Sequence, residues 1–134
     1  MKTAKQSEKS IHKQVATYLK LQYPKVIFRT DFAAGCKMSI GQAVAHKALQ
    51  SGPGYPDLFI AYPSKGYNGL FIELKKDISE VWRKDLQLVK NDHIHTQVTM
   101  LAALNKLGYL AVFGFGFDHA KKIIDEYLNQ DVYF

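Results

Sequence analysis

The sequence contains a single cysteine, Cys36, and no long apolar run. One cysteine excludes an intramolecular disulfide and a zinc site made of several cysteines, which suits a reducing, cytoplasmic setting. No stretch approaches the roughly 18 uninterrupted apolar residues that a membrane-spanning helix requires. Residues 1–6 have no apolar segment behind their lysines, so a secretory signal is not expected.

Internal repeats, low-complexity segments and linkers are also missing from the 134 residues. A single domain over residues 1–134 is therefore expected, because this length is typical of one compact domain. Hydrophobic residues make up 47% of the chain, which is enough to build a core and argues against global disorder. Acidic residues are in the minority, with 12 Asp and Glu against 18 Lys and Arg, and the net charge of +6 suits a polyanionic partner such as nucleic acid.

Hydrophobic periodicity and turn residues predict the order helix, strand, helix, hairpin, two helices, strand and helix. Ser39 and Gln42 form a capping-box pattern at the start of the second helix. The order predicts an α/β fold, with a mixed sheet flanked by helices. The expected helices cover residues 7–22, 40–50, 79–89 and 96–107, with a last one capped by Asp118, and the expected strands cover residues 25–30, 57–61, 69–75 and 109–115.

Charged residues stand at neighbouring ends of the two predicted hairpin strands. Asp57 opens the first strand, and Glu73 and Lys75 close the second. The connection 62–68 is short and rich in turn residues, which favours antiparallel pairing, so the start of one strand lies beside the end of the next. Because side chains alternate along a strand, Glu73 and Lys75 project to one face and Leu74 to the other. Two carboxylates and an ammonium group are thus expected to converge at one edge of the sheet.

This set of residues suits metal-assisted hydrolysis of a phosphodiester. The carboxylates of Asp57 and Glu73 are typical ligands of Mg²⁺ or Mn²⁺, which retain waters and accept phosphate oxygens. Such an ion activates a bound water, while Lys75 orients that water or stabilises developing negative charge. The carbonyl of Leu74 is a candidate further ligand. The alternative is an exposed hairpin with a surface ion pair, because Glu-x-Lys alone is common; the complete pattern favours catalysis.

The same residues resemble a known signature. Pro56-Asp57 and Glu73-Leu74-Lys75 resemble that of the PD-(D/E)xK nucleases, and the segments 54–58 and 71–75 are similar to the VRR-NUC group within that superfamily. Gln97 in the following helix and Gly108-Tyr109 before the last strand are also similar, so the resemblance runs from the first helix to about Leu128. It implies a restriction-endonuclease-like core and a DNA endonuclease that requires Mg²⁺ or Mn²⁺ and no organic cofactor.

Two further site residues follow from the resemblance. It implies that Glu8, in the first helix, binds the metal directly or through water; the alternative is a glutamate favoured by the helix dipole. It also implies that Gln97 forms hydrogen bonds near Lys75 or the attacking water. The segment 77–96 departs from the family pattern, which has a short connection here, and we interpret it as an extra helix. Gln87 therefore competes with Gln97 as the family glutamine.

Several surface residues are candidates for contacts with DNA. Tyr55 and Tyr67 are candidates for stacking, and the loop 31–35 for lining the cleft. The segment 92–95, Asp-His-Ile-His, is interpreted as a solvated turn rather than a transition-metal site. The candidate phosphate contacts are Lys76, which adjoins the motif, and Lys37, Lys47, Lys65, Arg83 and Lys84.

The expected DNA substrate follows from the resemblance and from the absence of a motif that reads base sequence. The sequence has no recognisable helix-turn-helix or zinc finger, so specificity is expected to come from DNA shape, dimer geometry or a partner protein. The resemblance to stand-alone, virus-type VRR-NUC proteins implies that the protein is a homodimer. It also implies that the homodimer cuts branched DNA in the manner of a Holliday-junction resolvase. A monomeric flap or nicking nuclease and a catalytically silent DNA-binding or assembly module on the same fold are the alternatives.

Overall fold

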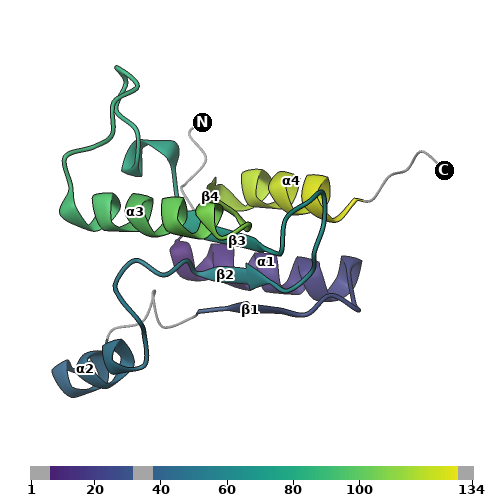
Figure 1. Cartoon of the computed structure of the whole chain (residues 1–134), viewed down its shortest axis with the longest axis horizontal. Helices are drawn as coiled ribbons and strands as arrows, with labels where there is room; N and C mark the ends of the chain where they lie inside the picture. The colour runs from purple at the N-terminus through teal and green to yellow at the C-terminus, as the bar shows by residue number, and fades with distance from the viewer. Residues whose placement is uncertain (1–6, 32–37, 130–134) are drawn as a thin grey trace.

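The computed structural model of the chain describes residues 7–31 and 38–129 (Figure 1). Ser7 caps the first helix by accepting from the backbone N–H of Ser10, and Ser39 and Gln42 form the expected capping box of the second. The elements are α1 (Glu8–Gln22), β1 (Phe28–Thr30), α2 (Ile40–Ala48), β2 (Leu58–Ile60), β3 (Leu70–Lys75), the 3-10 helix η2 (Ile78–Glu80), α3 (Asp92–Lys106), β4 (Leu110–Phe115) and α4 (Gly116–Leu128).

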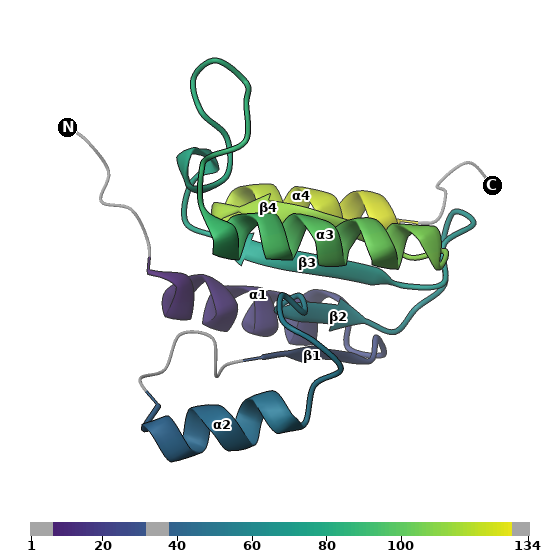
Figure 2. The ribbon, with the colours of Figure 1, turned by 60° about the vertical axis from the view of Figure 1, so that its left-hand side comes forward.

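The four strands form one mixed sheet in the order β1-β2-β3-β4. The first three strands are antiparallel, and β4 runs parallel to β3. The predicted hairpin of β2 and β3 is therefore confirmed, as is the mixed sheet flanked by helices. All six residues of β3 are buried, because strands cover both of its edges and helices cover both of its faces (Figure 2).

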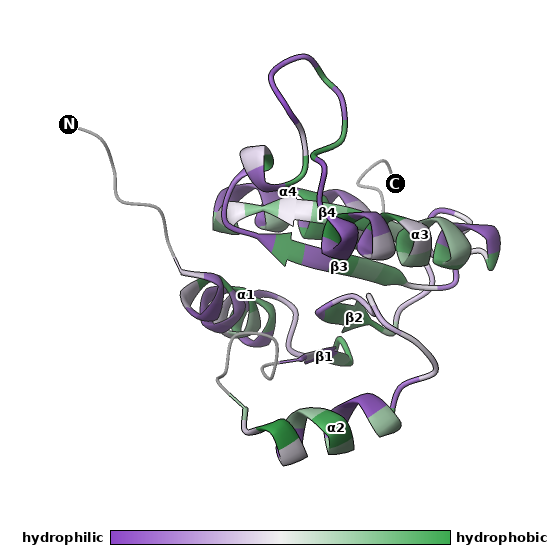
Figure 3. Cartoon of the chain, turned by 90° about the vertical axis from the view of Figure 1, so that its left-hand side faces the viewer, coloured by the Kyte–Doolittle hydropathy of each residue, from purple (hydrophilic) through white to green (hydrophobic). Residues whose placement is uncertain are grey.

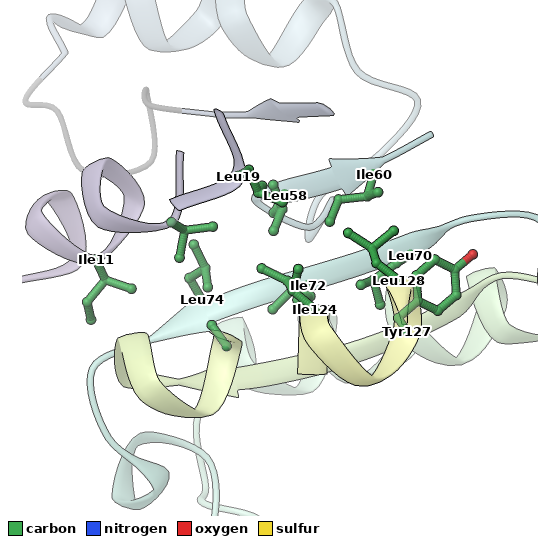
Figure 4. Close-up of a cluster of buried hydrophobic side chains, with 12 residues drawn as sticks. Ile11, Leu19, Leu58, Ile60, Leu70, Ile72, Leu74, Ile124, Tyr127 and Leu128 are labelled. Atoms are coloured by element: carbon green, nitrogen blue, oxygen red, sulfur yellow. The ribbon is translucent and has the colours of Figure 1, made fainter. Parts of the chain in front are cut away.

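The larger core lies between the sheet and the pair formed by α1 and α4 (Figure 4). Alternate residues of the hairpin strands point into it, among them Leu58 and Ile60 from β2 and Ile72 from β3, all with no exposed surface. The apolar faces of α1 and α4 pack against them, with residues such as Ile11 and Ile124 that recur every three to four positions along each helix. Period-two strands and amphipathic helices thus bury their apolar faces against each other.

A second, smaller core lies on the opposite face of the sheet, under α3. Phe59 and Phe71 stack there with ring centroids 4.4 Å apart, and Leu101 and Leu104 of α3 cover them. Every second residue of β3 points into the larger core, and the residues between them therefore face α3. Glu73 belongs to this second set, and its position beneath α3 follows from the strand period.

The predicted helix over residues 79–89 is wrong. Only the short turn η2 forms there, and the chain then makes an irregular hairpin in which Trp82 pairs with Leu88. Local polar side chains compete with a helix, since the Asp85 carboxylate accepts from the backbone N–H of Gln87.

Two helix starts also differ from the sequence interpretation. Helix α3 begins at Asp92, four residues earlier than predicted, because Asn91 accepts from the N–H groups of His93 and Ile94. The segment 92–95 is therefore the first turn of a helix and not a solvated loop. Helix α4 begins at Gly116, directly after β4, so Asp118 lies in its first turn and is not its cap.

Helix α2 is set apart from the rest of the molecule, beyond β1 (Figures 1 and 2). None of its side chains is buried. None of the helices in residues 7–31 and 38–129 is long and apolar enough to cross a membrane.

The contact between α1 and α4 includes a polar cluster around Asp125. The hydroxyls of Tyr18 and Tyr23 donate to one carboxylate oxygen, at 2.5 and 2.7 Å, and the Lys121 ammonium donates to the other at 3.0 Å. Partial burial acts to raise the pKa of Asp125, but these hydrogen bonds and the lysine charge hold it below its ordinary value. The ionised carboxylate therefore fastens the two helices together.

We expect Asp125→Ala to lower the free energy of unfolding by about 1–3 kcal/mol, because three donors to a charged group are lost. The matched control is Glu126→Ala. The Glu126 side chain forms an exposed pair with Lys122 at 4.0 Å, so this substitution should cost at most about 1 kcal/mol. Since the pKa of Asp125 is lowered by folding, its contribution is complete above the ordinary carboxyl pKa and is lost as pH falls. Urea titrations at pH 7 and pH 3 test this, and an equal cost at both pH values would contradict it.

Candidate active site

Asp57 is held at the start of β2 by backbone groups on either side. Its carboxylate Oδ2 accepts from the N–H of Leu74 at 3.0 Å, and its own carbonyl accepts from the N–H of Asp31 at 2.6 Å. Gly54, with a φ of +85°, allows the preceding turn to approach α3, since a Cβ there would lie 2.9 Å from the carbonyl oxygen of Thr96. The acid is therefore fixed beside the end of β3.

Glu73 and Lys75 occupy the neighbouring positions on the same face. The Nε2 of Gln97 donates to Glu73 Oε1 at 2.8 Å, and the Lys75 Nζ lies 3.9 Å from that oxygen. Asp57, Glu73, Lys75 and Gln97 are each no more than 6% exposed. The structure thus brings together the four residues that the sequence and the resemblance assigned to catalysis.

The close carboxylates change the protonation of Glu73. The pKa of Glu73 is raised to about 10: burial is the largest cause, the Asp57 carboxylate adds to the rise, and the charge of Lys75 opposes it. Two buried carboxylates therefore do not ionise together with Lys75 alone as counter-charge. A divalent cation would supply the charge that both require.

The donor set fits a hard divalent ion. Among the described residues, buried Glu73 Oε2 has no hydrogen-bond partner, which is rare for a carboxylate oxygen, and a bound cation would satisfy it. Mg²⁺ is commonly held by one or two carboxylates together with waters and substrate phosphates, as Asp57 and Glu73 would allow. Within the described part of the chain, no group of three or more His, Cys, Asp or Glu side chains forms a metal cage. A closed structural zinc site is not supported there.

These groups line a cavity of about 550 Å³. Glu8 of α1 reaches the same cavity, as do His46 of α2 and Tyr55 of the turn before β2. Tyr55 is 48% exposed and packs edge-to-face on Phe71. The cavity is therefore bordered by α1, α2, α3 and the hairpin of β2 and β3. It is large enough for a phosphodiester group.

Gln97, and not Gln87, is the glutamine at the site. Gln97 lies in the second turn of α3, whereas Gln87 is exposed in the hairpin that replaces the predicted helix. Leu74 contributes its backbone N–H, while its side chain lies in the larger core.

The candidate DNA contacts lie at different places. Lys47 on α2, Lys76 after β3, and Arg83 and Lys84 in the irregular hairpin are all exposed. Lys65 and Tyr67 lie in the loop joining β2 and β3, at the end of the hairpin opposite Asp57, so they are not near the cavity that Asp57 and Glu73 line. Lys37 and residues 32–35 of the loop 31–35 lie outside the described residues.

Two histidines lie at the site: His12 was not among the residues considered from the sequence, and His93 was interpreted there as part of a solvated turn. His12 is 2% exposed; its Nδ1 lies 3.1 Å from Thr30 Oγ1 and its Nε2 lies 3.7 Å from Asp57 Oδ2. His93 Nε2 lies 3.2 Å from Gln97 Nε2. The available signal was spacing: His12 follows Glu8, and Gln97 follows His93, by four residues on one helix face.

Comparison with solved structures supports the fold. A structure described as a VRR_NUC domain protein superposes with a TM-score of 0.65 and 23% sequence identity, covering 95% of this chain and 92% of that chain. No family model and no curated protein matches the sequence. The chain therefore has a VRR-NUC fold, in agreement with the resemblance of its motifs.

We expect Glu73→Gln to stabilise the metal-free protein at neutral pH by on the order of 1 kcal/mol or more. Glutamine has the shape of the protonated acid and removes the cost of taking up a proton when the carboxylate is buried on folding. Because folding raises the pKa of Glu73, its contribution to stability is complete below the ordinary glutamate pKa of about 4.3 and declines as pH rises. The gain from the substitution should therefore shrink towards pH 4.

Thermal unfolding in EDTA between pH 4 and pH 9 measures this difference. Mg²⁺ or Mn²⁺ should then raise the melting temperature of the parent protein more than that of Glu73→Gln, because ligand binding stabilises the state that binds it. A loss of stability that is constant across the pH range would show that Glu73 is ionised in the metal-free fold.

Proposed function

We propose that the protein is a Mg²⁺- or Mn²⁺-dependent endodeoxyribonuclease that acts on branched DNA as a homodimer. The observation that carries the proposal is the buried convergence of Asp57, Glu73, Lys75 and Gln97 on one cavity. A purely structural role does not account for it, because burying two carboxylates beside each other is unfavourable. On the resemblance to virus-type, stand-alone VRR-NUC proteins, the proposal includes that the enzyme is virus-encoded and acts inside the cell.

Asp57 and Glu73 would hold the metal, with the Leu74 carbonyl and Glu8 as further ligands, directly or through water. A divalent ion held there stabilises charge on the phosphoryl oxygens and lowers the pKa of a bound water. The N–H of Leu74 orients Asp57, and Gln97 orients Glu73. The site is therefore preorganised before substrate arrives.

Lys75 carries the electrostatic part of the reaction. Its ammonium lies beside Glu73 and the residue is 6% exposed, so its charge is weakly screened by solvent. From this position it would orient the attacking water or stabilise the negative charge that develops on the phosphate.

DNA is the partner that the charges favour. The chain has a net charge of +6, and the exposed Lys47, Lys76 and Arg83 are available for phosphate contacts. Binding should accordingly weaken steeply as salt rises, because each phosphate contact releases counterions.

The homodimer is supported by the outward face of α2. Figure 3 shows that much of α2 is hydrophobic although the helix stands apart from the rest of the fold. Ile40 and Val44 are 87% and 63% exposed. Helical spacing places Gly41, Ala45 and Ala48 near them, with Lys47 at the border of this apolar face. The opposite side of α2 contributes His46 and Gln50 to the cavity. Pairing two copies through α2 would therefore hold two active sites at a fixed separation about a two-fold axis, which suits paired cuts across a four-way junction.

We expect Lys75→Ala and Asp57→Asn each to reduce cleavage by on the order of 10²–10³-fold or more, because each removes a preorganised charge at the reacting phosphate. The matched control is Lys106→Ala, which changes an exposed lysine at the end of α3 that does not line the cavity, and it should retain most of the activity. Nicking of supercoiled plasmid with Mg²⁺ or Mn²⁺ measures the rates, and thermal melting confirms folding. If both variants cleave like the parent, the assigned active site is wrong.

We expect the parent protein to be a dimer by gel filtration with light scattering, and Val44→Glu to be a monomer, because a charge is buried in an apolar interface. The matched control is Gln42→Glu, which adds the same charge to α2 away from the outward face and should leave the dimer intact. A monomeric parent would exclude the paired-cut model. Equal cleavage of linear duplex and four-way junctions would exclude preference for branched DNA.

A further inference from the structure

An ordered hairpin stands out from the fold between η2 and α3. Its arms are joined by hydrogen bonds from the N–H of Val89 to the carbonyl of Val81 at 2.9 Å and from the N–H of Arg83 to the carbonyl of Gln87 at 2.8 Å. Val81 at its base has no exposed surface, which anchors the projection to the body. We call residues 81–89 the projecting hairpin. It replaces the short connection that the family resemblance leads one to expect.

The tip of the projecting hairpin has an unusual residue. The N–H of Leu86 donates to the carbonyl of Arg83 at 3.0 Å, and Leu86 has a φ of +66°. This is a three-residue hairpin loop closed by a residue in the left-handed region, a position that ordinarily takes glycine. The sequence instead holds a leucine there that is 84% exposed. Neither backbone preference nor burial in this chain accounts for that side chain, which points to a role outside the fold.

The base of the projecting hairpin adjoins the active site. Glu80 and Asn91, the residues next to its two arms, line the same cavity as Asp57 and Glu73. A DNA strand bound at Asp57 and Glu73 would therefore pass close to the projecting hairpin. The apolar tip of this projection would then be available to DNA bound at the cavity.

The flanks of the tip suit a polyanion. Between Trp82 and Lys90 there are three basic residues, Arg83, Lys84 and Lys90, against one acidic residue, Asp85. Arg83 pairs with Asp85 at 3.1 Å, whereas no ion pair of Lys84 or Lys90 is found within residues 7–31 and 38–129. Trp82, at 41% exposure, adds an aromatic surface to the same projection. Cations that flank an exposed apolar tip are suited to phosphates on either side of a base step.

We propose that the projecting hairpin is a wedge for branched DNA, in which Leu86 inserts between bases and Lys84 contacts the adjoining phosphates. Apolar wedges in DNA-binding proteins unstack a base step at a cost of a few kcal/mol. That cost is smaller at a branch point, where stacking is already interrupted. The wedge would therefore favour branched over linear DNA at the proposed nuclease site. The proposal rests on the proposed function only in taking DNA as the substrate.

The test replaces the tip side chain without disturbing the turn. Leu86→Gly suits the left-handed backbone, so the variant should melt at or above the temperature of the parent. Leu86→Asn is the second variant, because asparagine also tolerates this region and gives a polar tip. Leu21→Ala, which trims a leucine that is 79% exposed on α1, is the matched control.

Two readouts are compared on a four-way junction and a linear duplex. With Ca²⁺ in place of the active metal, 2-aminopurine beside the branch point should brighten when the parent or Leu21→Ala binds, and should stay dim with both Leu86 variants. With Mg²⁺, the ratio of junction to linear cleavage should fall by on the order of tenfold for the Leu86 variants. Lys84→Ala should instead weaken binding to both DNAs and reduce the salt dependence by about one charge.

The outcomes separate the wedge from the nuclease. Unchanged 2-aminopurine signal and cleavage ratio in Leu86→Gly would overturn the wedge while leaving the active site intact. A signal that depends on Leu86 without any cleavage would support the wedge and refute the nuclease. A change in oligomeric state with Leu86→Gly would also overturn the wedge, because the tip would then contact a second copy of the chain.

Discussion

In the antiparallel pair of β2 and β3, Leu58 stands opposite Ile72, and this register assigns each residue of both strands to one face of the sheet. One set packs under α1 and α4 as the larger core. The alternate set, which includes Phe71 and Glu73, lies under α3. A shift by one residue would exchange the faces, burying carboxylates in the larger core and placing its leucines and isoleucines under α3. The core therefore determines where the acidic residues stand, although they repel each other.

The site is costly to the fold, and the surrounding packing offsets that cost. Burial and the neighbouring Asp57 raise the pKa of Glu73, so the metal-free site is an unfavourable place for charge. The hydrogen bonds from Leu74 and Gln97 nevertheless keep both carboxylates in position. Strain of this kind is typical of functional sites, where groups are held for a ligand and not for stability. Helix α2 and the projecting hairpin flank the cavity and are free to contact partners.

Where sequence reasoning failed, local polar groups or distant contacts decided the outcome. The helix expected over residues 79–89 is replaced by a hairpin because Asp85 bonds to nearby backbone and Leu86 adopts a left-handed conformation. Helix α3 starts early because Asn91 caps it. Apolar spacing alone does not reveal these competing bonds. His12 was missed for another reason, since its position in α1 gives no sign that it meets Thr30 and approaches Asp57.

Strand alternation, helix periodicity and the short turn of the hairpin act between residues close in the chain. For this reason the mixed sheet, the capping box at Ser39 and the meeting of Asp57 with Glu73 could be predicted from the sequence. The choice of Gln97 over Gln87 could not, and neither could the exposed outward face of α2. Both depend on how helices settle against the sheet, which is determined by packing between residues far apart in the sequence. The pairing of the two buried carboxylates is thus encoded locally, whereas the groups that orient and surround them are assembled by the tertiary fold.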